Sequence, residues 1–408
     1  MTPSENISVR GTCDENTCGM DYTGILSRSI QEIKPSGIRK FFDLLNGMSD
    51  VVALTVGEPD FVTPWHIRVA GIESLEKGKT YYTSNAGLVP LREEIAAYLN
   101  RRFGLTYDPV REVVVTVVCS EAIDLTMRAL IEPGDEVIIP QPSFVCYGPI
   151  CEMAHGVPVY IPTREENQFK LTADELRAAV TPKTKLVVLP FPSNPTGAIM
   201  TEDDLEAIAG VLRGTNIVVL SDEIYGELTY GRTHVSPASI PGMWERTILA
   251  SGFSKTYAMT GWRMGYLTAP APLAAQMLKI HQYAIMCAPT TSQFAAVEAL
   301  KNGDDDIERM RSEYNRRRRY LVNGLHSLGI DCFNPEGSFY VFPNISRFGM
   351  TSEEFCETLL YDYKLALVPG TAFGDCGEGF VRISYAYSVE HISQALDRLE
   401  KFIKDRTR

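Results

Sequence analysis

The sequence predicts an α/β fold in which a mostly parallel sheet, flanked by helices on both faces, is joined to a smaller α+β domain. Short apolar runs typical of buried strands recur between residues 111 and 253, and helical segments with polar faces separate them. After about residue 290 the pattern changes to one long polar helix followed by short strands. We therefore expect an N-terminal arm and part of the small domain at 1–49, a large domain at 50–290 and a small C-terminal domain at 291–408.

The elements of the predicted large domain alternate between strands and helices. Its strands are expected at 111–118, 134–140, 156–162, 185–192, 216–223 and 247–253. A helix at 120–130 carries acidic residues in its first turns, and another is expected at 147–155. Thr172–Glu175 forms a capping box that opens a third helix, and Thr201–Asp204 approximates one that opens a fourth.

The predicted small domain begins with a long helix at 304–328 and ends with a helix from about 388. Strands are expected between them at 337–344, 365–370 and 379–386. The long helix contains the basic run Arg316–Arg319, which we interpret as a solvated helix face.

Composition excludes several classes of function. A formal net charge of −12 over 408 residues argues against a nucleic-acid-binding surface, which needs clustered Lys and Arg. No apolar run approaches the length of a membrane span, and the start of the chain lacks the features of a signal peptide. Nine cysteines, an odd number, fit a reducing compartment, so we expect a cytoplasmic protein. Cys13 and Cys18 lack a second ligand pair, so no metal site is expected.

Chemically informative residues follow the predicted strands. Ligands bind beyond the carboxyl ends of strands in a sheet of this kind. Cys119 and Ser120 come after the first strand at the start of a helix, where free amides would hold a phosphate. Later strands are followed by a turn at 193–197, by Asp222 with Tyr225, and by Lys255. A phosphate cradle, an acid, a phenol, an amide and a lysine are therefore expected around one pocket.

Lys255 and Asp222 together point to a cofactor. A lysine that forms a Schiff base needs a partly desolvated amine, and a protonated pyridine nitrogen needs a buried carboxylate. Pyridoxal 5′-phosphate would use both groups. Taken alone, Asp222 is a candidate helix cap, and Lys255 with Arg263 could be ordinary surface cations. The combination favours the cofactor.

The sequence resembles the class I/II aminotransferases, which are pyridoxal-phosphate enzymes of fold type I, and most closely the bacterial branch that includes aspartate and aromatic amino-acid aminotransferases. The resemblance extends from about Ile25 to the end of the chain. Its motifs are GEPDF at 57–61, YYTSNAGLVPLR at 81–92, PSNPTG at 192–197, SDEIY at 221–225, SGFSKTYAMTGWRMGY at 251–266 and VRISYA at 381–386.

The resemblance implies roles around the cofactor ring. Lys255 would form the internal aldimine and then transfer the proton between the substrate Cα and the cofactor. Asp222 would pair with the pyridine nitrogen, while Asn194 and Tyr225 would hydrogen-bond the phenolic oxygen. Phe144 would stack on the ring, although it could also be a core aromatic. The Asn194–Pro195 bond is expected to be cis.

The resemblance also implies roles for the residues that bind anions. Arg263 and the backbone at Cys119 and Ser120 would bind the cofactor phosphate. Arg382 would bind the substrate α-carboxylate, helped by Asn194 and the backbone at Gly57. Tyr82 would reach the phosphate of the neighbouring subunit in a homodimer. The N-terminal arm would cover the side-chain pocket with Ile38.

Two residues depart from the family pattern, and two other functions stay open. Val118 stands where many relatives carry glycine, and Gly252 stands where some carry serine, so Ser251 or Ser254 would have to supply that hydroxyl. We expect an aminotransferase that moves an amino group from an aromatic or aspartate-like L-amino acid to an acceptor such as 2-oxoglutarate by a ping-pong mechanism. The alternatives are a carbon–sulfur β-lyase, which would usually carry histidine in place of Tyr225, and a non-catalytic regulator module, which would need an appended DNA-binding domain.

Overall fold

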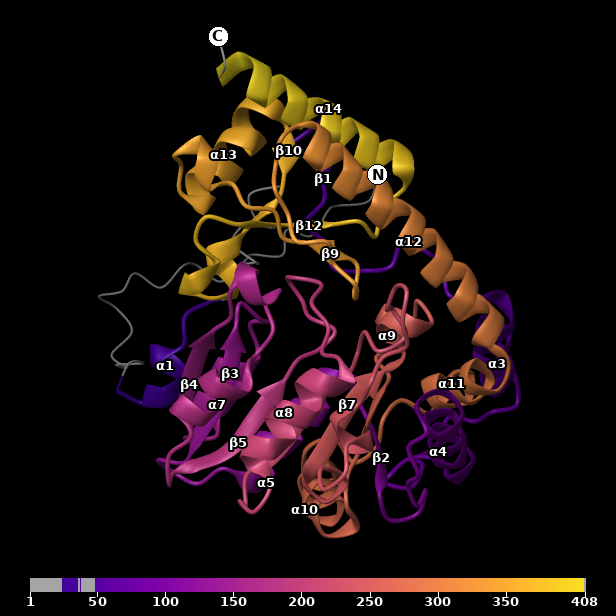
Figure 1. Cartoon of the computed structure of the whole chain (residues 1–408). Helices are drawn as coiled ribbons and strands as arrows, with labels where there is room; N and C mark the ends of the chain where they lie inside the picture. Colours follow the sequence, from indigo (N-terminus) through magenta and orange to yellow (C-terminus); the bar gives the residue numbers. More distant parts are fainter. Residues whose placement is uncertain (1–23, 36, 38–47, 407–408) are drawn as a thin grey trace, which may run out of the picture. The chain divides into compact units, whose positions relative to one another are not determined.

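The computed structural model describes residues 24–35, 37 and 48–406 (Figure 1). The chain divides into a short N-terminal unit that ends at Lys34 and one compact unit from Pro35 onward. The described helix of the N-terminal unit is α1 (Arg28–Glu32). None of the helices in the described ranges is long and apolar enough to cross a membrane.

A seven-stranded sheet forms the centre of the second unit, with strand order β2-β8-β7-β6-β5-β3-β4. Its strands are β2 (Val113–Thr116), β3 (Glu136–Gln141), β4 (Val157–Pro162), β5 (Thr184–Leu189), β6 (Val218–Asp222), β7 (Thr247–Gly252) and β8 (Gly265–Thr268). The pairs among β3 to β7 are parallel, whereas β8 is antiparallel to both β2 and β7. The predicted mostly parallel sheet is confirmed.

Alternating side chains of these strands face two helical layers, because successive residues of a strand point to opposite faces. Val137 and Ile139 pack in one core cluster, whereas Ile138 between them packs in another. The first face is covered by α5 (Val118–Leu130), α6 (Tyr147–Met153) and α10 (Ala271–Ala284). The other is covered by α7 (Ala173–Ala179) and α8 (Glu202–Leu212), as Figure 1 shows. Both predicted capping boxes are present, at α7 and α8.

Helices α3 (Trp65–Glu76), α4 (Val89–Phe103) and α11 (Thr290–Asn302) form a further packed group. Alanines of α11 share a core cluster with Val113 and Val115 of β2. Small side chains let α11 approach α3 and α4 closely. The predicted domain boundary near residue 290 stays a prediction.

The C-terminal elements form two small sheets covered by three helices. β9 (Tyr340–Val341), β11 (Val368–Pro369) and β12 (Val381–Ser384) make an antiparallel sheet, and β1 (Val52–Ala53) pairs in parallel with β10 (Leu365–Ala366). The helices are α12 (Asp304–Ser327), α13 (Ser352–Tyr363) and α14 (Val389–Arg406). The chain just after residue 50 therefore joins the C-terminal elements through β1.

The interpretation of the basic run in α12 as a solvated face is wrong for Arg317, although Arg316 and Arg319 are exposed. Arg317 is only 6% exposed, and it binds Asp60 and Glu313, each at 2.8 Å. Its guanidinium also lies 5.2 Å from the ring centroid of Phe61. Arg317 therefore lies away from solvent, and its charge is compensated by Asp60 of the loop at 57–61 and by Glu313 of α12 itself.

Candidate functional site

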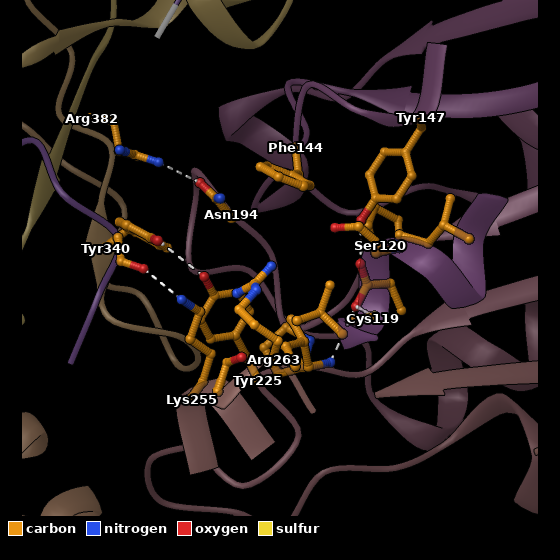
Figure 2. Close-up of a pocket in the computed structure, with 18 residues that line it drawn as sticks. Cys119, Ser120, Phe144, Tyr147, Asn194, Tyr225, Lys255, Arg263, Tyr340 and Arg382 are labelled. Carbon is orange, nitrogen blue, oxygen red and sulfur yellow. Dashed lines mark hydrogen bonds between the residues drawn. The ribbon is translucent and has the colours of Figure 1, made fainter. Parts of the chain in front are cut away.

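A cavity of about 300 Å³ lies at the carboxyl ends of the strands that precede the predicted site residues (Figure 2). The sequence-predicted residues that line it are Gly57, Cys119, Ser120, Phe144, Asn194, Asp222, Tyr225, Lys255, Arg263 and Arg382. Tyr82 does not line it and is 77% exposed. Ile38 and the two cysteines at 13 and 18 lie outside the described residues.

Lys255 lies on a short helix, α9 (Phe253–Thr256), that directly follows β7. Its Nζ donates a hydrogen bond to the carbonyl oxygen of Gly57 at 2.6 Å. Burial lowers the pKa of Lys255 from 10.5 to about 8; the nearby Arg263 and Arg382 act in the same direction and Glu58 acts against them. A lysine with this pKa has a substantial uncharged fraction near neutral pH, as a nucleophile or base requires.

Asp222 is the last residue of β6 and is 6% exposed. Its carboxylate accepts hydrogen bonds from Tyr147 Oη at 2.7 Å, from Cys119 Sγ at 3.3 Å and from the backbone N–H of Ile224 at 3.2 Å. Burial raises the pKa of Asp222, and these three donors oppose the rise. A cation placed against this carboxylate would oppose it further, because it favours the charged form.

Arg382 lies in β12 at another side of the cavity and is 2% exposed. Its guanidinium donates to Asn194 Oδ1 at 2.9 Å and to the carbonyl oxygen of Thr55 at 2.6 Å. It stacks between the rings of Tyr340 and Phe373, with centroid distances of 4.5 and 4.8 Å. Its Nε has no hydrogen-bond partner among the described residues. A buried cation with an unused donor is suited to a ligand carboxylate.

The start of α5 and Arg263 form the third part of the site. The helix begins at Val118, two residues earlier than predicted, so the backbone at Cys119 and Ser120 belongs to its first turn, which leaves amides unpaired. Arg263 Nη1 donates a hydrogen bond to the carbonyl oxygen of Thr260 at 2.9 Å, which is a neutral partner for its charge. An anion bound between them would meet a helix N-terminus and a guanidinium.

Tyr340 and Tyr147 also line the cavity, and the sequence did not reveal them. The hydroxyl groups of Tyr340 and Tyr225 are 3.0 Å apart (Figure 2). A Cβ at Gly57 would lie 2.1 Å from Tyr340 Oη, so a side chain at this position would displace Tyr340. The one signal for Tyr340 was its place in an aromatic-rich predicted strand, which is equally typical of a core residue.

Asn194, Ser254 and Phe144 complete the set of predicted residues at the cavity. The Asn194–Pro195 bond is cis, as predicted. Ser254 lines the cavity, whereas Ser251 does not and donates to the carbonyl oxygen of Glu223 at 3.2 Å. A Cβ at Gly252 would lie 2.9 Å from the carbonyl oxygen of Met264, which explains the small residue there. Phe144 contacts the cavity and meets Tyr147 edge to face.

The residues of the cavity fit pyridoxal 5′-phosphate. The cofactor carries a phosphate dianion, a basic ring nitrogen and an aldehyde, and the cavity offers a partner for each. These partners are the α5 terminus with Arg263, the buried Asp222, and Lys255 with its lowered pKa. The unpartnered Nε of Arg382 leaves room for one more anionic group, such as a substrate carboxylate.

Comparison with known proteins agrees with this geometry. Residues 49–399 match the family described as aminotransferase class I and II. The putative aminotransferase YugH of Bacillus subtilis (strain 168) is 52% identical over 385 residues, which cover 94% of this chain and 100% of that protein. An aspartate aminotransferase of Pyrococcus abyssi is 44% identical, with 93% of this chain and 99% of that protein covered. The crystal structure of an aromatic aminotransferase from Pyrococcus horikoshii has a TM-score of 0.86 at 43% identity, covering 91% of this chain and 99% of that chain.

Proposed function

Because the chain belongs to the aminotransferase class I and II family and is therefore a pyridoxal-phosphate-dependent aminotransferase, we propose that its cavity holds the cofactor between Asp222 and Lys255. The observation that carries this placement is the meeting, in one cavity, of a buried carboxylate, a lysine with a lowered pKa and a buried arginine with an unused Nε. The bound cofactor supplies an electron sink that stabilises negative charge at the substrate Cα.

Lys255 is proposed as the group that anchors the cofactor and moves the Cα proton. Its Nζ can accept that proton near neutral pH because its pKa is about 8. Asp222 would keep the ring nitrogen of the bound cofactor protonated, while Tyr147 and Cys119 hold the Asp222 carboxylate in position. Tyr225 and Asn194 are proposed as donors to the phenolic oxygen of the cofactor.

Arg382 is proposed to fix the orientation of the substrate. A bidentate contact with the α-carboxylate would leave the Cα–H bond perpendicular to the cofactor ring and would favour proton loss over decarboxylation. Thr55 and Asn194 hold the guanidinium, and stacking by Tyr340 and Phe373 restricts its plane.

The proposed donor is an L-amino acid with an aromatic or aspartate-like side chain, and the proposed acceptor is a 2-oxo acid such as 2-oxoglutarate. Relatives named for aspartate and for aromatic substrates support both kinds of donor. Screening twenty donors against 2-oxoglutarate tests this range, and a screen in which no donor yields glutamate would contradict it.

An absorbance spectrum tests the proposed chemistry. The holoenzyme should absorb at about 420 nm. A mixture of L-amino acids without a 2-oxo acid should shift this band to about 330 nm, as a half-transamination requires. Lys255→Ala protein should lack the first band. A band that persists while pyruvate and ammonia form from cysteine would instead support the β-lyase.

We also propose a homodimer in which Tyr82 reaches the partner's site. Tyr81 and Tyr82 are 57% and 77% exposed, and Tyr283 and Met286 are 86% and 44% exposed. Hydrogen bonds from Asn85 to Met286 O and from Thr290 to Tyr81 O join the two segments. An exposed apolar surface of this kind is typical of an interface. Mixing Lys255→Ala with Tyr82→Ala subunits should restore part of the activity that each variant lacks; a monomer in light scattering would contradict the proposal.

A cytoplasmic location is a further proposal, supported by free cysteines at all the described cysteine positions. Cell fractionation tests it.

A further inference from the structure

The turn that leads into α5 adopts a conformation that its sequence disfavours. Val118 has a φ of +64°, in the left-handed region where a β-branched side chain is strained. Because the next residues are Cys119 and Ser120, the direction of their amides depends on this turn. Something outside Val118 must hold the backbone there.

Three contacts surround the turn. Thr116 Oγ1 donates to the carbonyl oxygen of Val118 at 2.9 Å. The backbone N–H of Val117 donates to Glu121 Oε2. Gly265 of β8 packs directly on the turn, since a Cβ there would lie 2.4 Å from the carbonyl carbon of Val118. The turn is thus held by hydrogen bonds on both sides of Val118, and Gly265 packs against it.

His281 of α10 extends this arrangement. Its Nδ1 donates to Glu121 Oε1 at 2.6 Å, and the side chains of His281 and Glu121 are 0% and 10% exposed. Its Nε2 has no hydrogen-bond partner within the described ranges, so Glu121 is the polar contact that orients the ring. The two oxygens of the Glu121 carboxylate therefore link α10 to the backbone just before Val118.

We propose that the His281–Glu121 pair is a positioning pair, which holds Val118 in the left-handed conformation and so aims the amides at the start of α5 toward the cofactor phosphate. This inference rests on the proposed function, because it takes the α5 terminus as the phosphate site. Neither side chain lines the cavity, so the pair acts through the backbone.

A double-variant cycle tests the pair, since glycine at 118 removes the strain that the pair opposes. In apo protein titrated with pyridoxal 5′-phosphate, Glu121→Ala should raise the dissociation constant about tenfold, a factor that matches the cost of a left-handed residue. His281→Ala should act in the same direction. In the Val118→Gly background the same Glu121→Ala change should cost less than about threefold.

Titration with unphosphorylated pyridoxal distinguishes a loss of phosphate binding from a loss of binding elsewhere in the site. Affinity for pyridoxal should be unchanged in Glu121→Ala, because the altered amides contact only the phosphate. Asp124→Ala on the same helix is the matched control: Asp124 pairs with Arg128 at the surface, and its removal should leave both affinities unchanged.

Each outcome is decisive. A wild-type protein that binds pyridoxal 5′-phosphate no better than pyridoxal would contradict the proposed phosphate site itself. If the wild type and Glu121→Ala prefer pyridoxal 5′-phosphate over pyridoxal by the same factor, the role of the positioning pair is overturned and the proposed phosphate site is not. If Glu121→Ala does not fold, the Val118→Gly/Glu121→Ala protein should fold; failure of both to fold would also overturn the inference.

Discussion

Lys255 shows how burial sets reactivity at the scale of one residue. Covalent attachment to added cofactor requires the uncharged amine. In apo protein, the attachment rate should therefore rise with pH through about 8 and then level off. Stopped-flow absorbance between pH 6 and 11 measures this, with Lys255→Ala as the blank, and a midpoint at 10.5, the ordinary value for lysine, would contradict the assigned environment.

Arg382 should tolerate no other cation. Lysine retains the charge but cannot replace a planar fork that binds Asn194 and Thr55 and that we propose to bind the substrate carboxylate. Arg382→Lys should raise KM for amino donors roughly 10- to 100-fold, as expected for loss of a charge-assisted bidentate contact. Affinity for pyridoxal 5′-phosphate is the control and should be unchanged; an equal loss of cofactor affinity would contradict the role.

The sequence was enough to nominate site residues that lie in distinctive motifs. It did not identify aromatic residues that reach the cavity only through the fold. Lys255, Asp222 and Arg382 lie in motifs whose residue types suit few other roles. Tyr340 and Tyr147 are aromatic residues of ordinary strands and helices, and only the fold brings them to Tyr225 and Asp222. Arg317 was misassigned for the same reason, since its partner Asp60 lies 257 residues away.

At the scale of elements, the strands with continuous apolar runs were predictable and the shorter or mixed ones were not. Strand β8 has only four residues, and it begins inside the Lys255 motif without a separate apolar run. Helix α11 is rich in alanine and threonine, so its sequence lacks a strong apolar stripe, although α3 and α4 enclose it.

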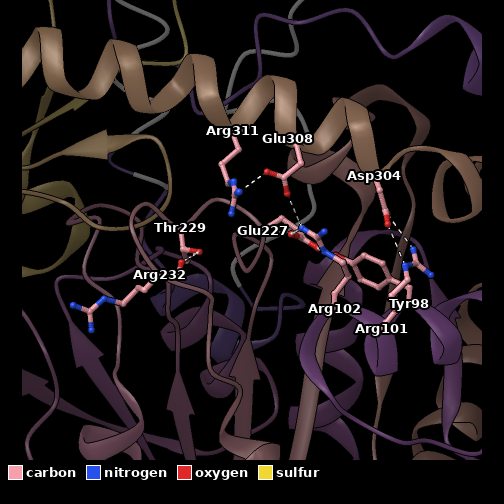
Figure 3. Close-up of polar contacts among 9 residues, drawn as sticks. All are labelled: Tyr98, Arg101, Arg102, Glu227, Thr229, Arg232, Asp304, Glu308 and Arg311. Carbon is pink, nitrogen blue, oxygen red and sulfur yellow. Dashed lines mark hydrogen bonds and ion pairs between the residues drawn. The ribbon is translucent and has the colours of Figure 1, made fainter.

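An ion-pair group connects two helices and the turn at 224–227 (Figure 3). Arg102 of α4 binds both oxygens of Glu227, at 2.9 and 2.6 Å, and also reaches Glu308 of α12. Tyr98 donates to Glu227 at 2.6 Å, and the Glu227 side chain is only 4% exposed. Without Arg102, the buried carboxylate of Glu227 keeps only the neutral Tyr98 hydroxyl as a donor within this group.

Arg102→Met should therefore lower the free energy of unfolding by about 2–4 kcal/mol, somewhat less than for a fully buried pair. Arg101→Met is the matched control, because Arg101 and its partner Asp304 are both 41% exposed, and it should cost under about 1 kcal/mol. Urea unfolding of the apo proteins measures both, and equal losses would contradict the importance of burial.

At the scale of the whole molecule, His66 joins helices that lie far apart in the sequence. From α3, its two ring nitrogens contact Glu298 of α11 at 2.7 Å and Asp306 of α12 at 2.9 Å. Burial acts to lower the pKa of His66, but hydrogen bonds and charge from the two carboxylates outweigh it and raise the pKa above 6.5. The protonated ring can donate to both partners at once.

Because this pKa is raised in the folded state, the stabilisation is complete below pH 6.5 and is lost as the pH rises through the higher folded value. The melting temperature of the wild type should fall more between pH 6 and pH 8 than that of His66→Gln. Differential scanning calorimetry at several pH values checks this, and parallel curves for the two proteins would contradict it.

Positions in the cavity wall differ in how readily they accept a new side chain. At Gly57 any side chain would overlap the Tyr340 hydroxyl, so a substitution there would displace Tyr340. At Ser120, by contrast, only the backbone is assigned to the phosphate, and Ile123 lines the cavity from the same helix without a polar contact of its own. A small saturation library at Ser120 and Ile123 therefore varies the wall beside the proposed phosphate site, and so the choice of cofactor, while the backbone around Gly57 stays unchanged.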